Sequence, residues 1–170
     1  MKNGFYLLLI AIFLMFSVNI SAQIIKGTFA IKNVQTGMVL RIKDANNKNG
    51  TPLVAYEPVN WKCVTWDFKH IAGDTYQLKN LFTGKTFQAK GADSISGGVL
   101  EQQPFIAEQL NQQYNFVLLQ NNIYLIKQKG TALYLTPVDK TGEVNTGIKL
   151  TKKDGTKLQQ WTIYEQKPTM

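Results

Sequence analysis

Few residues in this sequence belong to the types that perform covalent or metal chemistry. The 170 residues include one cysteine, Cys63, and one histidine, His70. One cysteine excludes an intramolecular disulfide framework and a Cys-rich zinc site, and one histidine leaves little room for a Ser-His-Asp triad. Cys63 lies between Trp61 and Trp66, so we expect a buried thiol, with pairing to a second chain as the alternative. The sequence predicts no metal site and no cofactor.

The carboxylates do not form a recognisable catalytic pair. The chain has 11 acidic residues, and a glycosidase needs two of them across a scissile bond. Asp44, Asp139 and Asp154 all lie in turns rich in Gly, Asn and Lys, where a solvated Asp is common. We therefore predict that the protein is not an enzyme.

Basic residues are the other candidates for binding chemistry, because the formal net charge is +8. Four of them crowd one stretch near the C-terminus: Lys149, Lys152, Lys153 and Lys157. This stretch is either a solvated face or a polyanion site, for instance for an acidic polysaccharide. Nucleic acid is not expected as a partner, because these lysines are not interleaved with aromatic residues.

The N-terminal residues 1–22 have the three-part pattern of a secretory signal peptide. Lys2 is followed by an apolar run over residues 5–18, and the small Ala22 precedes the expected cleavage point. The run is too short for a membrane span of about 20 residues. We expect a secreted or periplasmic protein, with residues 23–170 as a single domain and no transmembrane anchor after cleavage.

The remaining chain repeats itself three times, in residues 26–72, 73–120 and 121–166. Residues 29–33 are echoed by residues 76–80 and 124–128, at offsets of 47 and 48. Each copy is followed by a Gly and, three residues later, by an apolar residue: Leu40, Phe87 or Leu133. Each repeat closes on an aromatic residue: Trp66, Tyr114 or Trp161. A fixed period of this kind indicates a fold built from repeats.

The residue pattern within each repeat is typical of β-strands. Apolar and polar residues alternate over short stretches bounded by turn signals such as Thr36-Gly37 and Thr83-Gly84. About four strands per repeat give about twelve in all. One repeat cannot bury its own apolar face, whereas three can share a core. We predict an all-β fold, a β-trefoil in which six strands form a barrel and three hairpins cap one end, with the closing aromatic residues in the core.

Several motifs resemble the repeat of ricin B-type lectins. The resemblance rests on Gly50–Tyr56 followed by Trp66, and on Gln112-Gln-Tyr114 and Gln159-Gln-Trp161, which are similar to the Q-x-W signature of that family. It covers residues 26–166 and implies a β-trefoil with non-catalytic binding of sugars. It also implies that the Gln and the aromatic residue of the signature are structural. In the first repeat, Val64 replaces the Gln.

The resemblance also places the sugar contacts. The family has an acidic residue just after the first apolar marker, and here that place holds Arg41, Gln88 and Tyr134, none of them a carboxylate. The aromatic platform of the family falls on Tyr56 in the first repeat, and on Gln103 and Lys153 in the other two. The resemblance therefore favours the first repeat as the binding repeat.

A sugar presents one apolar face and a rim of hydroxyl groups, so its site needs an aromatic plane and matched polar groups. We assign the predicted sugar site to Tyr56, Asp44, Asn60 and Trp61. In this assignment Asp44 replaces the missing acceptor, and its alternative role is that of a plain turn residue. Trp61 is either part of the core or an exposed ring beside Tyr56.

These observations favour a secreted protein that binds a carbohydrate or glycoconjugate. The alternative is a β-trefoil that contacts a protein partner, for example a protease inhibited through an exposed loop, because one fold supports many functions. Binding of a polyanion through the basic third repeat is the other alternative.

The signal-peptide hypothesis predicts cleavage after Ala22. Mass spectrometry of the exported protein should find Gln23, free or cyclised, at the N-terminus. A mature chain that still carried residues 5–18 would refute the hypothesis.

Overall fold

Six strands form a closed barrel in the computed structural model, which describes residues 24–91 and 94–169; the expected signal peptide, residues 1–22, lies outside them. The barrel strands are β1 (Gly27–Asn33), β4 (Trp66–Ala72), β5 (Thr75–Asn80), β8 (Gln113–Gln120), β9 (Ile123–Gln128) and β12 (Gln160–Glu165). Each pairs antiparallel with the next, and β12 pairs back with β1. This closure leaves the barrel without an exposed edge.

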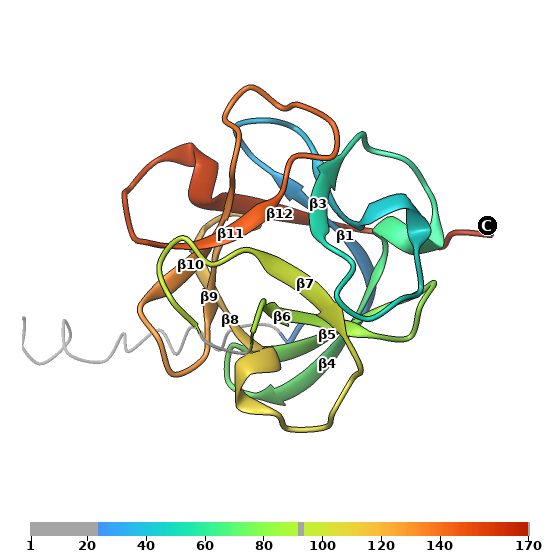
Figure 1. Ribbon diagram of the computed structural model, residues 1–170. Helices are drawn as coiled ribbons and strands as arrows, with labels where there is room; N and C mark the ends of the chain where they lie inside the picture. Colours follow the sequence, from blue (N-terminus) through green and yellow to red (C-terminus); the bar gives the residue numbers. More distant parts are fainter. Residues whose placement is uncertain (1–23, 92–93, 170) are drawn as a thin grey trace, which may run out of the picture.

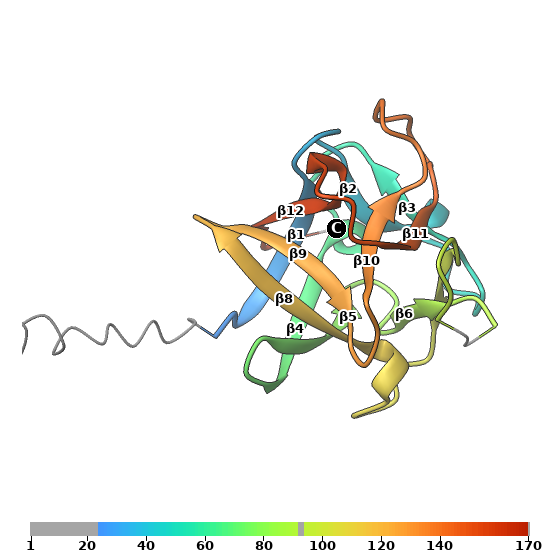
Figure 2. The ribbon, with the colours of Figure 1, turned by 90° about the vertical axis from the view of Figure 1, so that its left-hand side faces the viewer.

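Three hairpins cap one end of the barrel, as Figure 2 shows with the barrel on the left and the hairpins on the right. They are β2 (Val39–Ile42) with β3 (Leu53–Tyr56), β6 (Thr86–Ala89) with β7 (Leu100–Gln103), and β10 (Leu133–Pro137) with β11 (Ile148–Lys152). The predicted all-β trefoil is confirmed. None of the helical segments among the described residues has the length and apolar character needed to cross a membrane.

Short 3-10 turns precede the last strand of each repeat. These turns are η2 (Lys62–Val64), η3 (Leu110–Gln112) and η4 (Lys157–Gln159), and a further turn, η1 (Lys43–Ala45), follows β2. Each repeat thus contributes two barrel strands and one hairpin, and the three hairpins lie around a common centre in Figure 1.

The closing aromatic residues lie at the centre of the core, as predicted. Trp66 and Tyr114 have no exposed surface and Trp161 is 1% exposed. Each donates a hydrogen bond of 3.1–3.2 Å to a hairpin carbonyl in its own repeat: Trp66 to Leu40, Tyr114 to Phe87 and Trp161 to Leu135. Burial raises the pKa of the Tyr114 hydroxyl far above its ordinary value, so this group stays a neutral donor. These hydrogen bonds therefore link each hairpin to the last barrel strand of its own repeat.

These hydrogen bonds correct the sequence alignment of the third repeat. Leu135, and not Leu133, is the counterpart of Leu40 and Phe87. The hairpin turns agree, because matching backbone bonds run from Lys43 to Pro52, from Lys90 to Val99 and from Val138 to Gly147. A shift of two residues keeps every side chain on the same face of a strand. The apolar pattern therefore could not distinguish the two registers.

Buried side-chain amides link each repeat to a neighbouring one. At the end of β1, β5 and β9, an amide nitrogen donates to a carbonyl oxygen in a 3-10 turn of another repeat: Asn33 to Leu158, Asn80 to Cys63 and Gln128 to Asn111, at 2.8–3.1 Å. The three amides are at most 1% exposed. The turns η2, η3 and η4 are therefore each held in place by another repeat.

The core assignment predicts that Trp66→Ala and Trp161→Ala each destabilise the fold by about 3–5 kcal/mol, because a buried ring and its hydrogen bond are lost. Trp61→Ala is the matched control, since Trp61 is 37% exposed, and it should change the melting temperature little. Thermal unfolding of the three variants tests this assignment. An unchanged melting temperature in both core variants would show that it is wrong.

Candidate functional site

The first repeat has an open cavity of about 310 Å³ beside η2. Its lining residues come from η1 and β2, from η2 with the residue before it, and from the β5–β6 turn: Arg41, Ala45, Trp61, Lys62, Cys63 and Phe82. Two exposed aromatic rings face solvent here, Trp61 and the 52% exposed Phe82. The lining thus combines aromatic surface with two cationic side chains.

Arg41 is the unusual group of this cavity, because it is 92% removed from solvent and poorly paired. The carbon at the centre of its guanidinium group lies 3.9 Å from the ring centroid of Tyr56, a cation–π contact. Its Nε is buried and has no hydrogen-bond partner among the described residues. Neither of the two ion pairs found there involves Arg41. A buried donor without a partner typically costs about 1–3 kcal/mol.

Arg41 Nε lacks a hydrogen-bond partner among the described residues because one residue differs between the first repeat and the other two. In the second repeat, Gln112 Nε2 donates to Gln88 Oε1 at 2.9 Å, and Gln88 is the counterpart of Arg41. The third repeat has the same arrangement, from Gln159 to Thr136 at 3.3 Å. In the first repeat Val64 stands at this place and joins a small apolar cluster next to β2. The first repeat therefore has no side-chain amide at the place from which Gln112 and Gln159 donate.

The corrected register also changes two counterparts in the third repeat. Thr136, and not Tyr134, is the counterpart of Arg41. Each of the two lies two residues before the donor of the matching hairpin bond, Val138 in the third repeat and Lys43 in the first. By the same register, Thr151 replaces Lys153 as the counterpart of Tyr56. The absence of a carboxylate at these three places is unchanged.

The structure brings Tyr56 and Trp61 together, with ring centroids 6.2 Å apart and planes inclined by 34°. Tyr56 is half-buried and Arg41 lies over its ring, and of these two aromatic residues Trp61 lines the cavity, together with Phe82. Asp44 and Asn60 are exposed on the flanking turns, and neither lines the cavity. Asp44 has a φ of 53°, the left-handed conformation that Asp adopts in turns.

Of the six lining residues, sequence reasoning placed only Trp61 at the site. It missed Ala45, Lys62, Cys63 and Phe82, and it did not treat Arg41 as a direct participant. Phe82 belongs to the second repeat, and its only signal was a large apolar residue beside the turn Thr83-Gly84. Position 41 drew attention only because the acidic residue of the family is absent there. The positive charge of Arg41 itself indicates a site that donates hydrogen bonds to a ligand.

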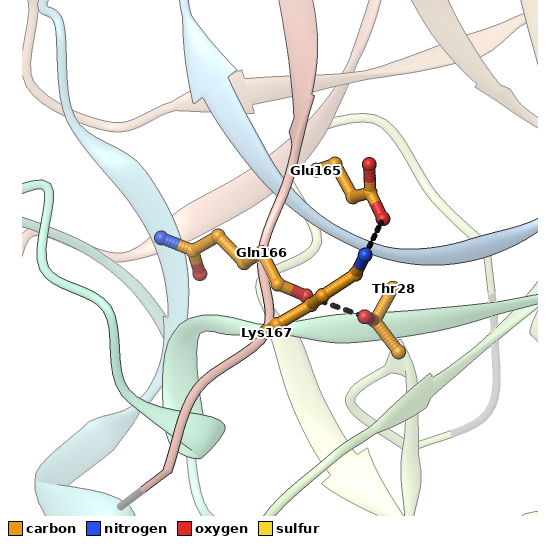
Figure 3. Close-up of polar contacts among 4 residues, drawn as sticks. All are labelled: Thr28, Glu165, Gln166 and Lys167. Atoms are coloured by element: carbon orange, nitrogen blue, oxygen red, sulfur yellow. Dashed lines mark hydrogen bonds and ion pairs between the residues drawn. The ribbon is translucent and has the colours of Figure 1, made fainter.

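The C-terminal segment holds the loop that carries Trp61. Gln166 Nε2 donates to the Val59 carbonyl oxygen at 2.9 Å, and its Oε1 is 2.7 Å from the hydroxyl of Thr65. That hydroxyl is also 2.8 Å from the carbonyl oxygen of Trp61. The backbone of Gln166 is fixed in turn by Thr28 on β1, as Figure 3 shows. The end of the third repeat therefore braces the site loop of the first, residues 57–65.

The basic stretch lies in a different repeat from the cavity. Lys149 is half-buried on β11, whereas three lysines are exposed at the end of β11, in the following loop and at the start of η4: Lys152, Lys153 and Lys157. No ion pair to these lysines is found within residues 24–91 and 94–169. The two candidate binding surfaces can therefore be tested independently.

Comparison with known proteins identifies the class. Residues 16–103 match the model of the family described as ricin-type beta-trefoil lectin domain-like, so the chain belongs to that family. Among curated proteins, none matches the chain.

Several solved structures share the fold. A designed threefold-symmetric protein, ThreeFoil, is 18% identical with a TM-score of 0.77, over 82% of this chain and 99% of its own. The agglutinin of Rhizoctonia solani is 17% identical with a TM-score of 0.75, over 85% of this chain and 98% of its own. A ricin B-like lectin of Macrolepiota procera, solved with lactose, is 20% identical with a TM-score of 0.68, over 83% and 97%.

The brace predicts that Gln166→Ala loosens the site loop, because the carbonyl of Val59 and the hydroxyl of Thr65 lose a buried partner. We expect a loss of about 1–3 kcal/mol in urea unfolding and faster hydrogen exchange in residues 57–65. Lys167→Ala is the control, since its ion pair with Glu165 is exposed on both sides. Equal behaviour of the two variants would contradict a bracing role for Gln166.

Proposed function

We propose that this protein is exported and binds carbohydrate without catalysis, through the cavity of the first repeat. One observation carries the proposal: Trp61 presents an exposed ring in a cavity beside the Tyr56–Arg41 pair. An exposed aromatic side chain at a cavity provides a surface on which the apolar face of a sugar can stack.

The other two repeats lack this ring. The residue at the place of Trp61, three positions before the end of the 3-10 turn, is Gln109 in the second repeat and Thr156 in the third. Binding in the first repeat alone explains why the aromatic pair occurs once in a threefold scaffold. Asp44 and Asn60, exposed on the turns beside the cavity, are the groups we propose for the sugar hydroxyls.

Membership of a lectin-like family supports a carbohydrate as the ligand. The Macrolepiota procera lectin, which has the same fold, was solved in complex with lactose. The chemistry of the cavity is compatible with non-catalytic binding, because neither of its charged lining residues is a carboxylate that could act as a general acid or nucleophile.

A second candidate is a polyanion site in the third repeat, favoured by Lys152, Lys153 and Lys157, which are exposed and lack ion pairs among the described residues. Such binding depends on these lysines, is indifferent to Trp61 and falls steeply as salt rises.

The proposal predicts that Trp61→Ala abolishes sugar binding while the melting temperature stays within a few degrees of the wild type. Isothermal titration against a panel of monosaccharides and disaccharides measures this. We expect wild-type dissociation constants on the order of millimolar to high micromolar, because a small open site immobilises few groups.

Gln109→Ala, at the matching place of the second repeat, is the control and should bind like the wild type. Retention of full affinity in Trp61→Ala would place the sugar elsewhere. Failure to bind any glycan, combined with capture of a defined protein such as a protease, would favour the protein-binding alternative.

A further inference from the structure

We propose that the cavity of the first repeat selects acidic sugars, and that the Arg41 guanidinium pairs with the sugar carboxylate. This inference rests on the proposed function, since it names the class of sugar for the same cavity. It is carried by an unpartnered buried cation in a cavity whose lining holds no carboxylate.

The charge of the cavity is the first argument. Its two ionisable side chains other than the thiol of Cys63 are Arg41 and Lys62, both cationic. Asp44 is adjacent in sequence to the lining residue Ala45, but its exposed side chain is not part of the lining, and a further cation, Lys43, precedes it. A cavity with this balance lowers the free energy of an anion within it.

The hydrogen-bonding capacity of Arg41 is the second argument. A guanidinium group has five N–H donors and no acceptor. A carboxylate at the same place would accept hydrogen bonds from two sugar hydroxyls, whereas Arg41 can pair with both oxygens of a ligand carboxylate in a bidentate contact. An acidic residue at this place complements sugar hydroxyls, whereas an arginine complements a sugar carboxylate.

The fixed position of the guanidinium group is the third argument. The ring of Tyr56 supports it at 3.9 Å, and Val64 provides no amide to occupy it, in contrast with Gln112 in the second repeat. An arginine whose position is set before binding loses little conformational freedom when the ligand arrives. The first repeat therefore keeps a preformed cation free for a ligand.

Trp61 specifies that the anion is carried by a sugar ring. Its exposed side chain lines the same cavity as Arg41, so one ligand can stack an apolar face on the indole and direct a carboxylate to the guanidinium group. Hexuronic acids and sialic acids both have this combination.

The test compares each acidic sugar with its neutral methyl ester. Methyl glycosides of galacturonic acid, glucuronic acid and N-acetylneuraminic acid are titrated against the intact protein at two salt concentrations, and the three arms identify which acidic sugar fits. We expect at least one acid to bind tenfold or more tightly than its ester.

The variant Arg41→Gln introduces the residue of the second repeat and should remove this preference, leaving acid and ester with equal, weak affinity. Val64→Gln should weaken acid binding as well, because the new amide can occupy Arg41. The double variant Lys152→Ala and Lys153→Ala is the charge control and should keep the preference. Melting temperatures are measured for every variant, and the acid-to-ester comparison in the wild type needs no variant.

Equal binding of acid and ester by the wild type would overturn the inference while leaving carbohydrate binding intact. A preference that survives Arg41→Gln but is lost with Lys152 and Lys153 would also overturn it, by moving the anion to the third repeat. Absence of binding to acids, esters and the neutral panel alike would overturn the proposed function itself.

Discussion

The amide contacts between repeats are the constraint on which the rest of the structure depends. Asn33, Asn80 and Gln128 each donate across a repeat boundary to the 3-10 turn of another repeat. The 3-10 turn before the last strand of each repeat therefore takes a hydrogen-bond partner from another repeat, so the three repeats stabilise one another. The closing aromatic rings then fix each hairpin above the barrel, so the hairpin ends and the turns beside them occupy threefold-related positions. Burial of the amides makes their loss costly and the frame rigid.

This frame permits one repeat to differ from the others. In the second and third repeats, Gln112 and Gln159 satisfy the hairpin polar group within the repeat. In the first repeat Val64 takes the place of this glutamine. Arg41 is buried against Tyr56, and its Nε has no hydrogen-bond partner among the described residues. The cost of an unpaired donor is tolerated because the surrounding structure is held by the amides and by the brace at Gln166. A local loss of stability at a preorganised cation is the arrangement expected of a binding site.

The sequence was sufficient to predict the fold, because the markers at Trp66, Tyr114 and Trp161 recur at a nearly constant period and a repeat must share its core. It was insufficient for the third-repeat register, since Leu133 and Leu135 lie on the same face of a strand. Tyr56 and Trp61 were predicted as partners from their proximity in sequence. The contribution of Phe82, from another repeat, and of Gln166, more than 100 residues from Val59, depends on tertiary contacts that no local pattern encodes.

The most direct test of the account uses the indole N–H signals of the three tryptophans in a ¹H–¹⁵N NMR spectrum. The indole N–H groups of Trp66 and Trp161 are buried in hydrogen bonds to Leu40 and Leu135, whereas the Trp61 ring is exposed at the cavity. Titration with an acidic sugar should shift the Trp61 signal saturably and leave the other two in place. A Trp61 signal that does not move while backbone amides around Lys152 and Lys153 shift would contradict the assignment of the binding site to the first repeat.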